Sequence, residues 1–338
     1  MVAAMVQELI LQKKYLTEPV STIYFGGGTP SLMHSNAIAQ VLNTIHANYN
    51  VTNTVECTLE ANPDDITAQA IIQWKAIGIN RLSIGIQSFT DDELTWMNRA
   101  HNAAQAIHSV QCAQANGIGN ISIDLIYGTP LLTSQAWQQH LHQAVQLGIQ
   151  HVSCYALTVE PHTALEAMIA KHKKAPLDPN KAATHMELLM ALAPTLGLEH
   201  YEISNLALPG YRSKHNSNYW QGVPYLGIGP SAHSYNVHSR QWNIANNALY
   251  IQALSQGTIP YEVEILTPTQ QCNEYIMTAI RTAEGISIAT LLQVYNYNVL
   301  PAIEVYLTQG LLLIRNNNII LTTQGKLRAD GIASALFK

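Results

Sequence analysis

A glycine-rich segment, Gly26-Gly27-Gly28-Thr29-Pro30, could bind a ligand through its backbone. It follows residues 22–25, whose β-branched and aromatic side chains predict a buried strand. Glycines allow positive φ and carry no Cβ, so bare N–H and C=O groups can approach a ligand closely. The alternative is an ordinary turn, which needs only one glycine. Three glycines in succession therefore favour a ligand-binding loop.

Four polar side chains stand at or near the carboxyl ends of separate predicted strands: Glu60, Gln87, Asp124 and Thr158. In a (β/α) barrel, all strands deliver these ends to one mouth, where active sites form. A buried polar group is costly unless it is hydrogen-bonded or binds a ligand. The alternative is a set of satisfied core residues. We expect these side chains and the glycine loop to surround one pocket.

Aromatic residues and histidines gather in a later segment, from Leu208 to Asn236. It contains Lys-His-Asn-Ser-Asn-Tyr-Trp at 214–220 and Gly-Ile-Gly-Pro-Ser-Ala-His-Ser at 227–234. We expect an irregular, loop-rich stretch, and long irregular stretches inside compact domains are usually functional. By itself the pattern also fits a loop histidine beside core aromatics.

Strands and helices alternate through the first half of the chain. Strands are expected at 22–25, 54–60, 81–87, 121–127 and 151–158, and helices at 3–16, 36–48, 67–77, 90–98, 103–116 and 134–147. The strand cores read as apolar on both faces, which is typical of a parallel sheet covered by helices. A barrel and an open doubly wound sheet both satisfy this pattern, and the strand-end polar residues favour the barrel. A helix at 180–196 and a strand at 201–205 follow.

The last 70 residues indicate a small separate module. Helices at 270–282, 287–294 and 299–308 precede a hairpin at 310–322 and a final helix that ends at Phe337. This order is typical of a winged-helix fold. Only Arg315, Lys326 and Arg328 could contact phosphates, too few for a nucleic-acid track. We therefore expect an interaction or lid module and no nucleic-acid partner.

Composition narrows the function classes further. The chain has 338 residues with a net charge of −5, which gives no electrostatic case for nucleic acid or an anionic membrane. It has no apolar run long enough for a transmembrane helix, and the amino-terminal lysines follow the apolar segment, unlike a signal peptide. Four scattered cysteines without a C-x-x-C pair indicate neither disulfides nor zinc, and predict a reducing, cytoplasmic setting.

Five motifs in order carry a family resemblance: FGGGTPS, LEANPDD, RLSIGIQSF, DLIYGTP and GIGPSAHS. With them the whole chain resembles the radical S-adenosylmethionine (SAM) enzymes, in the branch of oxygen-independent coproporphyrinogen III dehydrogenases and HemW-type heme chaperones. The resemblance implies an α/β fold, a partial (β/α) TIM-like barrel at 1–205. It implies a connecting segment at 206–266 and a winged-helix-like α+β domain at 267–338.

The same resemblance implies which residues hold SAM. Gly27, Gly28 and Thr29 would contact its methionine amino group, and Glu60 would clamp the same cofactor. Gln87, Arg99 and Asp124 would reach its ribose and carboxylate, because a guanidinium suits a carboxylate and a carboxylate suits hydroxyls. Thr158 would line the adenine.

The chain departs from the family in its cysteines. The family binds a [4Fe-4S] cluster on C-x-x-x-C-x-x-C, after the first barrel strand, and Cys57, Cys112, Cys154 and Cys272 cannot replace that motif. We therefore expect the first strand and cluster loop to be missing, by truncation rather than natural loss. As given, the chain should not cleave SAM reductively, and whether the protein is an enzyme stays open.

The segment at 214–220 matches the HNxxYW signature of the HemW-type branch through His215, Asn216, Tyr219 and Trp220. The resemblance implies heme contact, with His215 as a candidate ligand of the iron and the aromatics against the macrocycle. The leading hypothesis is a chaperone that passes heme to an acceptor protein. The alternatives are oxidative decarboxylation of coproporphyrinogen III to protoporphyrinogen IX, and a cluster-free binding or scaffold protein. Peripheral membrane contact is left open.

Overall fold

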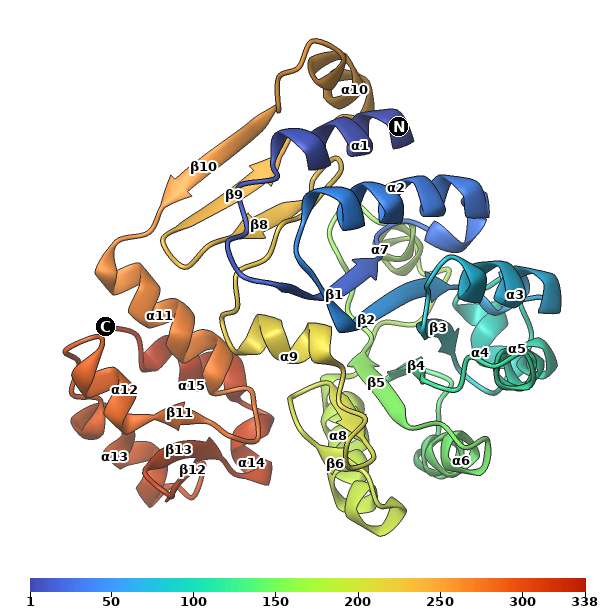
Figure 1. Cartoon of the computed structure of the whole chain (residues 1–338). Coiled ribbons are helices and arrows are strands. Elements are labelled where there is room, and N and C mark those ends of the chain that lie inside the picture. Colours follow the sequence, from blue (N-terminus) through green and yellow to red (C-terminus); the bar gives the residue numbers. More distant parts are fainter.

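The computed structural model describes residues Met1–Lys338, and its largest element is a curved sheet of seven strands (Figure 1). Its five parallel strands are β1 (Val20–Phe25), β2 (Val51–Ala61), β3 (Arg81–Gln87), β4 (Ile121–Tyr127) and β5 (His151–Ala156). They lie side by side in chain order. An open doubly wound sheet reverses its strand order at a switch point, and this sheet does not. The expected partial (β/α) barrel is confirmed.

Helices cover the outer side of this sheet in the same order (Figure 1). They are α2 (Ser35–Asn48), α3 (Ala68–Ala76), α4 (Asp91–Trp96), α5 (Ala103–Ala115), α6 (Ser134–Gln146) and α8 (Pro179–Leu192). The short helix α7 (Ala164–Ala170) is drawn behind β1 and α2 instead, away from α6 and α8. Short 3₁₀ turns lie at Pro30–Leu32, Pro63–Asp65 and Ala193–Leu196. Every helix expected from the hydrophobic period in this half is present, and α7 is additional. No helix of the chain is both long and apolar enough to cross a membrane.

The two faces of the parallel sheet differ, so the prediction of strands apolar on both faces was wrong. Leu59, Ile84 and Ile123 face the helices and are completely buried. Their neighbours in the strands alternate to the inner face. There Glu60 is paired with Ser83, and Asp124 with Ser153. An incomplete barrel leaves its inner face around a space rather than against a helix layer, so that face can be polar.

The expected strand at 201–205 is instead a turn between two short strands. β6 (Glu199–His200) and β7 (Asn205–Ala207) pair antiparallel, and β7 adds to the edge of β5. The buried Glu202 carboxylate accepts hydrogen bonds from the Ser204 N–H, at 3.2 Å, and from the Asn205 side chain. These local bonds close the turn, and a hydrophobic pattern does not reveal them.

The connecting segment at 206–266, expected to be loop-rich, contains regular elements. It holds α9 (Lys214–Trp220), α10 (Asn247–Ser255) and an antiparallel sheet of β8 (His233–Tyr235), β9 (Ser239–Asn243) and β10 (Tyr261–Ile265). The amino-terminal helix α1 (Val2–Leu11) packs beside α10, and its buried Glu8 accepts from Tyr250 at 2.5 Å and Asn243 at 2.6 Å. The polar composition of α9 hid its helical character.

The carboxyl-terminal part has a hydrophobic core of its own and contains the helices and hairpin expected for a winged-helix-like fold. It comprises α11 (Pro268–Ala279), β11 (Ile286–Ser287), α12 (Ile288–Gln293), α13 (Leu300–Thr308), β12 (Leu312–Arg315), β13 (Asn318–Leu321), α14 (Thr323–Lys326) and α15 (Ala329–Ala335). The predicted domain boundaries, after residues 205 and 266, stay a prediction. Strand β7 runs across the first of them.

Candidate functional site

The glycine loop is tied to the end of β2 by Glu60. The Gly27 N–H donates to Glu60 Oε2 at 3.1 Å, and the Tyr24 hydroxyl donates to Oε1 at 2.7 Å. Gly27 and Gly28 have φ of 75° and 71°, which non-glycine residues rarely adopt. The loop therefore presents exposed backbone beside a carboxylate that two donors hold in place.

The first glycine of the loop is needed for a different reason, which is space. A Cβ on Gly26 would lie 2.6 Å from Tyr24 Cε1 and 3.0 Å from Glu60 Oε1. A side chain there would push apart the tyrosine and the carboxylate that bind the loop. The three glycines thus serve two needs, close approach at the first and positive φ at the other two.

Gln87 and Arg99 meet at the carboxyl end of β3. The Arg99 guanidinium donates to Asn62 Oδ1 at 3.2 Å and to the Gly85 carbonyl at 3.4 Å. A Cβ on Gly85 would lie 2.8 Å from Gln87 Nε2, so this glycine makes room for the amide. Gln87 itself has a φ of 66°, a strained value that clusters at functional sites. Burial lowers the pKa of Arg99, which remains a cation at neutral pH.

Asp124 lies in the middle of β4, on the inner face, rather than at the strand end. Burial raises its pKa to about 6, and the hydroxyls of Ser153 and Ser83 partly offset this effect. The charge of Glu60 raises the pKa as well, so the two carboxylates lie close enough to interact. The inner face therefore brings Gly27, Glu60 and Asp124 together.

Thr158 is separate from this group. It is exposed after the end of β5, and its hydroxyl donates to Glu160 at 3.2 Å. Its side chain makes no hydrogen bond to the other predicted SAM residues.

Helix α9 begins against the inner face of the sheet. The Glu56 carboxylate accepts from the backbone N–H of Lys214, at 3.2 Å, and of His215, at 3.0 Å. Ser213 caps the helix through the Asn216 N–H. A carboxylate at a helix amino terminus interacts favourably with the helix dipole. Glu56 thereby sets the position of the whole HNxxYW segment.

His215 has one ring nitrogen engaged and the other without a hydrogen bond. Its Nδ1 lies 3.1 Å from the Thr22 hydroxyl, and its ring stacks on Tyr24 with centroids 4.6 Å apart. Tyr219 meets the ring edge-on at 5.0 Å. Burial lowers the pKa of His215 to about 4, so the imidazole is neutral at physiological pH. A proton on Nδ1 would leave Nε2 free to bind a metal.

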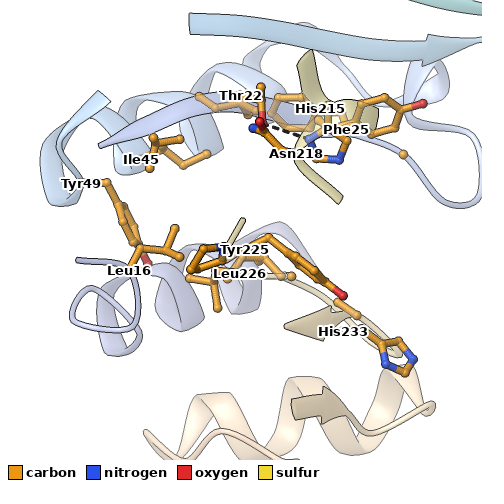
Figure 2. Close-up of a pocket in the computed structure, with 18 of the residues that line it drawn as sticks. Leu16, Thr22, Phe25, Ile45, Tyr49, His215, Asn218, Tyr225, Leu226 and His233 are labelled. Carbon is orange, nitrogen blue, oxygen red and sulfur yellow. Dashed lines mark hydrogen bonds between the residues drawn. The ribbon is translucent and has the colours of Figure 1, made fainter. Parts of the chain in front are cut away.

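Two cavities flank α9. The first, the loop pocket, has a volume of about 1070 Å³ and is lined by Gly27, Thr29, Glu60 and His215, among others. Figure 2 shows its two walls, with Thr22, Phe25, Ile45 and His215 on one and Tyr225, Leu226 and His233 on the other. The second, the aromatic pocket, measures about 590 Å³ and is lined by Trp220. Asn216 and Tyr219 line both, so the four HNxxYW residues do not face a single cavity.

The cysteines do not form a cluster site. Cys57 and Cys154 are buried among the side chains that face the helices, and Cys272 lies in the carboxyl-terminal core. Cys112 lies on α5, and all four are free thiols. No group of three or more His, Cys, Asp or Glu side chains could hold a metal ion. The residues present therefore do not fit a [4Fe-4S] cluster.

The sequence of this chain is similar to those of known proteins. The Radical SAM superfamily matches residues 3–144. The heme chaperone HemW of Mycobacterium tuberculosis is 33% identical over 97% of this chain and 84% of its own length, and that of Bacillus subtilis is 31% identical over 98% and 89%. This chain belongs to the HemW family of radical SAM proteins. A mitochondrial radical SAM domain-containing protein 1 of Mus musculus is 32% identical over 94% of the chain and 75% of its own length.

The fold has a solved counterpart in the radical SAM enzyme coproporphyrinogen III oxidase (HemN) of Escherichia coli. The two align with a TM-score of 0.82 and 20% identity, over 99% of this chain and 82% of that one. At this identity the likeness supports the fold alone. It confirms the radical SAM type of partial barrel inferred from the strand order.

Four residues near these sites were missed from the sequence: Thr22, Tyr24, Glu56 and Asn62. Thr22 and Tyr24 alternate along β1, and Glu56 lies four residues before Glu60 on the same face of β2. Counting back two residues at a time from Gly26 and from Glu60 would have found these three residues, because alternate residues of a strand share a face. Asn62 lies two residues after Glu60, just past the end of β2, so the same count taken forward includes it, but its contact with Arg99 is visible only in the structure.

Proposed function

We propose that this chain binds heme and transfers it to an acceptor protein; its relatives are named heme chaperones. The observation that carries the proposal is a neutral His215 on the wall of the loop pocket, with Nε2 free of hydrogen bonds. Neutral imidazole is a common ligand of heme iron. His215 is the proposed axial ligand.

The surroundings of His215 support this role. Metal-binding histidines usually use their second ring nitrogen in a hydrogen bond that fixes the ring, and Thr22 offers such a partner at 3.1 Å. Asn216, Tyr219 and apolar residues such as Ile45 and Leu226 line the same cavity. The volume of about 1070 Å³ leaves room for a macrocycle. Trp220 lines only the aromatic pocket, so its contact with heme stays a prediction.

The same family membership implies SAM, and the inner-face residues fit part of it. We assign its binding to the backbone of Gly27 and Gly28 with Thr29, to Glu60, and to Gln87, Arg99 and Asp124. The close approach of Glu60 to Gly26 and of Gln87 to Gly85, and the strained φ of Gln87, support a built ligand site. Thr158 stays a prediction without a supporting contact.

SAM supplies a 5′-deoxyadenosyl radical when an iron–sulfur cluster reduces it. Because the residues of this chain do not fit that cluster, we derive no catalytic step. In the proposed function, the inner-face residues bind and orient SAM. Four free thiols agree with the predicted cytoplasmic setting, which stays a prediction.

Titration with hemin under anaerobic conditions tests the proposal. The wild-type chain should give a saturable Soret shift, and His215→Ala should abolish that shift or weaken binding at least tenfold. His142→Ala, at an exposed position on α6, is the matched control and should behave like the wild type. Equal Soret shifts in wild type and His215→Ala would remove His215 as the ligand. No saturable binding by the wild type would end the proposal.

Transfer requires its own measurement. The heme-loaded chain is mixed with apomyoglobin as a generic acceptor, and the Soret band is followed as heme moves. Release within minutes agrees with a carrier, whereas retention for hours would indicate a storage or cofactor role.

A further inference from the structure

A chain of buried polar side chains runs across the inner face of the sheet. Ser122 on β4 is hydrogen-bonded to His151 on β5, with 2.6 Å between Oγ and Nδ1. The other ring nitrogen of His151, Nε2, lies 2.8 Å from the Tyr201 hydroxyl. All three side chains are at most 3% exposed, and none of them lines either cavity. They do not touch a ligand in these cavities, so any effect on binding is indirect.

One end of this polar chain reaches the proposed SAM site. The Ser122 hydroxyl lies 3.4 Å from the Ser153 hydroxyl, and Ser153 is the register partner of Asp124 on the neighbouring strand. Burial raises the pKa of Asp124, and the Ser153 hydroxyl partly offsets this effect because it stabilises the charged form. An ionised carboxylate only accepts hydrogen bonds, so Ser153 donates to Asp124.

The other end reaches the start of helix α9. The Arg212 guanidinium lies over the Tyr201 ring, with Cζ 5.3 Å from the ring centroid. The next residue, Ser213, caps the amino terminus of α9. Burial raises the pKa of Tyr201, and the backbone of Ser213 partly offsets this effect, so the Ser213 N–H faces the phenolic oxygen. The polar chain therefore links the SAM site to the segment that carries His215.

His151 decides the direction of the hydrogen bonds in this chain. Burial and the nearby Arg81 guanidinium hold the pKa of His151 well below its usual value, so the ring is neutral. A neutral imidazole has one N–H donor and one acceptor nitrogen. If the proton lies on Nδ1, the ring donates to Ser122 and accepts from Tyr201. If the proton lies on Nε2, both hydrogen bonds are reversed.

The charge of Asp124 selects one of these two directions. The carboxylate accepts the Ser153 proton, which leaves the Ser153 oxygen to accept from Ser122. The Ser122 oxygen then accepts from His151, whose proton must lie on Nδ1. Nε2 in turn accepts from Tyr201, whose oxygen keeps its lone pairs for the backbone N–H at the start of α9. Every hydrogen bond of the chain then points toward Asp124.

We propose that His151 is a positioning residue that couples the SAM site to helix α9. The coupling rests on the functions proposed above for Asp124 and His215. The Asp124 side chain keeps some exposure on the inner face, so water can donate to it when no ligand is bound. SAM hydroxyls replace that water and fix the carboxylate as an acceptor, which favours the direction in which Tyr201 holds the start of α9.

Two consequences follow for the binding sites. SAM should hold His215 in its position against the pocket wall and thereby tighten heme binding. Heme should tighten SAM binding by the same factor, because the coupling free energy between two sites is reciprocal.

The tautomer of His151 tests the direction of the chain without any ligand. Nitrogen-15 NMR of the full chain, labelled at histidine, distinguishes the two ring nitrogens, and the loss of one set of signals in His151→Gln assigns them. We expect the proton on Nδ1 at pH 7.5. Asp124→Asn should move it partly to Nε2, because an amide donates as well as accepts. A proton on Nε2 in the wild type would overturn the proposal.

Titrations of hemin with and without saturating SAM, at pH 7.5, test the coupling itself. In the wild type, SAM should lower the hemin Kd at least threefold, and hemin should lower the SAM Kd by the same factor. Ser122→Ala and Tyr201→Phe should each reduce this factor to less than 1.5-fold. Matched controls are Ser109→Ala and Tyr297→Phe, whose hydroxyls donate to backbone carbonyls elsewhere, and both should keep the wild-type factor.

The outcomes separate this proposal from the binding proposals. Saturable binding of both ligands without mutual effect would overturn the coupling and leave both sites in place. An unchanged factor in Ser122→Ala and Tyr201→Phe would also overturn it, because the polar chain would then carry no coupling. Absence of saturable hemin or SAM binding would end the corresponding binding proposal and the coupling with it. Thermal melts of each variant show whether a lost factor reflects unfolding, and a lost factor with a native-like melt supports the proposal.

Discussion

The two faces of the parallel sheet are built from the same strands and have opposite chemistry. Leu59 and Glu60 are consecutive in β2, yet one is completely buried against helices and the other binds the glycine loop. The outer face stabilises the fold by removing apolar surface from water. The inner face instead gathers carboxylates, hydroxyls and amides, and most of these have a partner within the chain. Alternate residues of a strand thus serve different purposes: those on the outer face stabilise the fold, and those on the inner face form the binding site.

The largest expected effect tests the outer face. Leu59→Ala should lower the free energy of unfolding by about 2 to 5 kcal/mol, because it leaves a cavity in the core. Glu60→Gln, one residue away, should lower it by less than about 1 kcal/mol, because the amide oxygen still accepts from Tyr24. Urea unfolding followed by circular dichroism measures both. Equal losses would contradict the division between faces.

A smaller effect comes from the buried Asp124 carboxyl. Its pKa is raised to about 6, so the folded state holds this proton more tightly than the unfolded chain, and its contribution to stability is lost as pH rises from about 4 to about 6. Asp124→Asn should therefore be more stable than the wild type at pH 7, by about 1 to 3 kcal/mol, with the difference vanishing near pH 4. Unfolding midpoints over this pH range measure it.

The exposed Asp92→Asn is the control for that pH series and should show no such trend. If Asp124→Asn is less stable than the wild type at every pH, the carboxylate has an unrecognised stabilising partner on the inner face.

Gly26→Ala tests the close packing of Tyr24 and Glu60 against the glycine loop. The added methyl would collide with Tyr24 and Glu60, so we expect at least tenfold weaker SAM binding and about 1 kcal/mol lower stability. Calorimetric titration with SAM measures the affinity. Gly119→Ala is the control, because its Cβ would meet nothing within 4 Å. Unchanged affinity in Gly26→Ala would place SAM away from this loop.

The smallest effect expected is an absence of pH dependence at His215. Because burial lowers its pKa to about 4, the imidazole stays neutral from pH 7.5 to 5.5, and hemin affinity should change less than twofold through this site. An exposed histidine with a pKa near 6.5 would lose most of its neutral form over the same range. Soret titrations at several pH values decide between the two. A tenfold loss at pH 5.5 would mean that the ring is solvated.

Sequence reasoning worked best where a local pattern decides the structure. The parallel strands and their helices follow from the hydrophobic periodicity and from the glycines that end the helices. The glycine loop follows from three consecutive glycines. Sequence reasoning failed where the structure depends on contacts between residues that are far apart in the sequence. Helix α9 is polar and short, and it is held by Glu56, more than 150 residues away in the chain. The turn at 201–205 likewise depends on its buried Glu202.

The sequence by itself determined the family and the order of the parallel strands and of the helices between them, because these depend on neighbours along the chain. Only the tertiary structure decided which face of each strand is polar, and that α9 divides the HNxxYW residues between two cavities. Those features depend on which surfaces meet after folding. The alternation of residues along a strand tells which side chains share a face, but not what packs against that face.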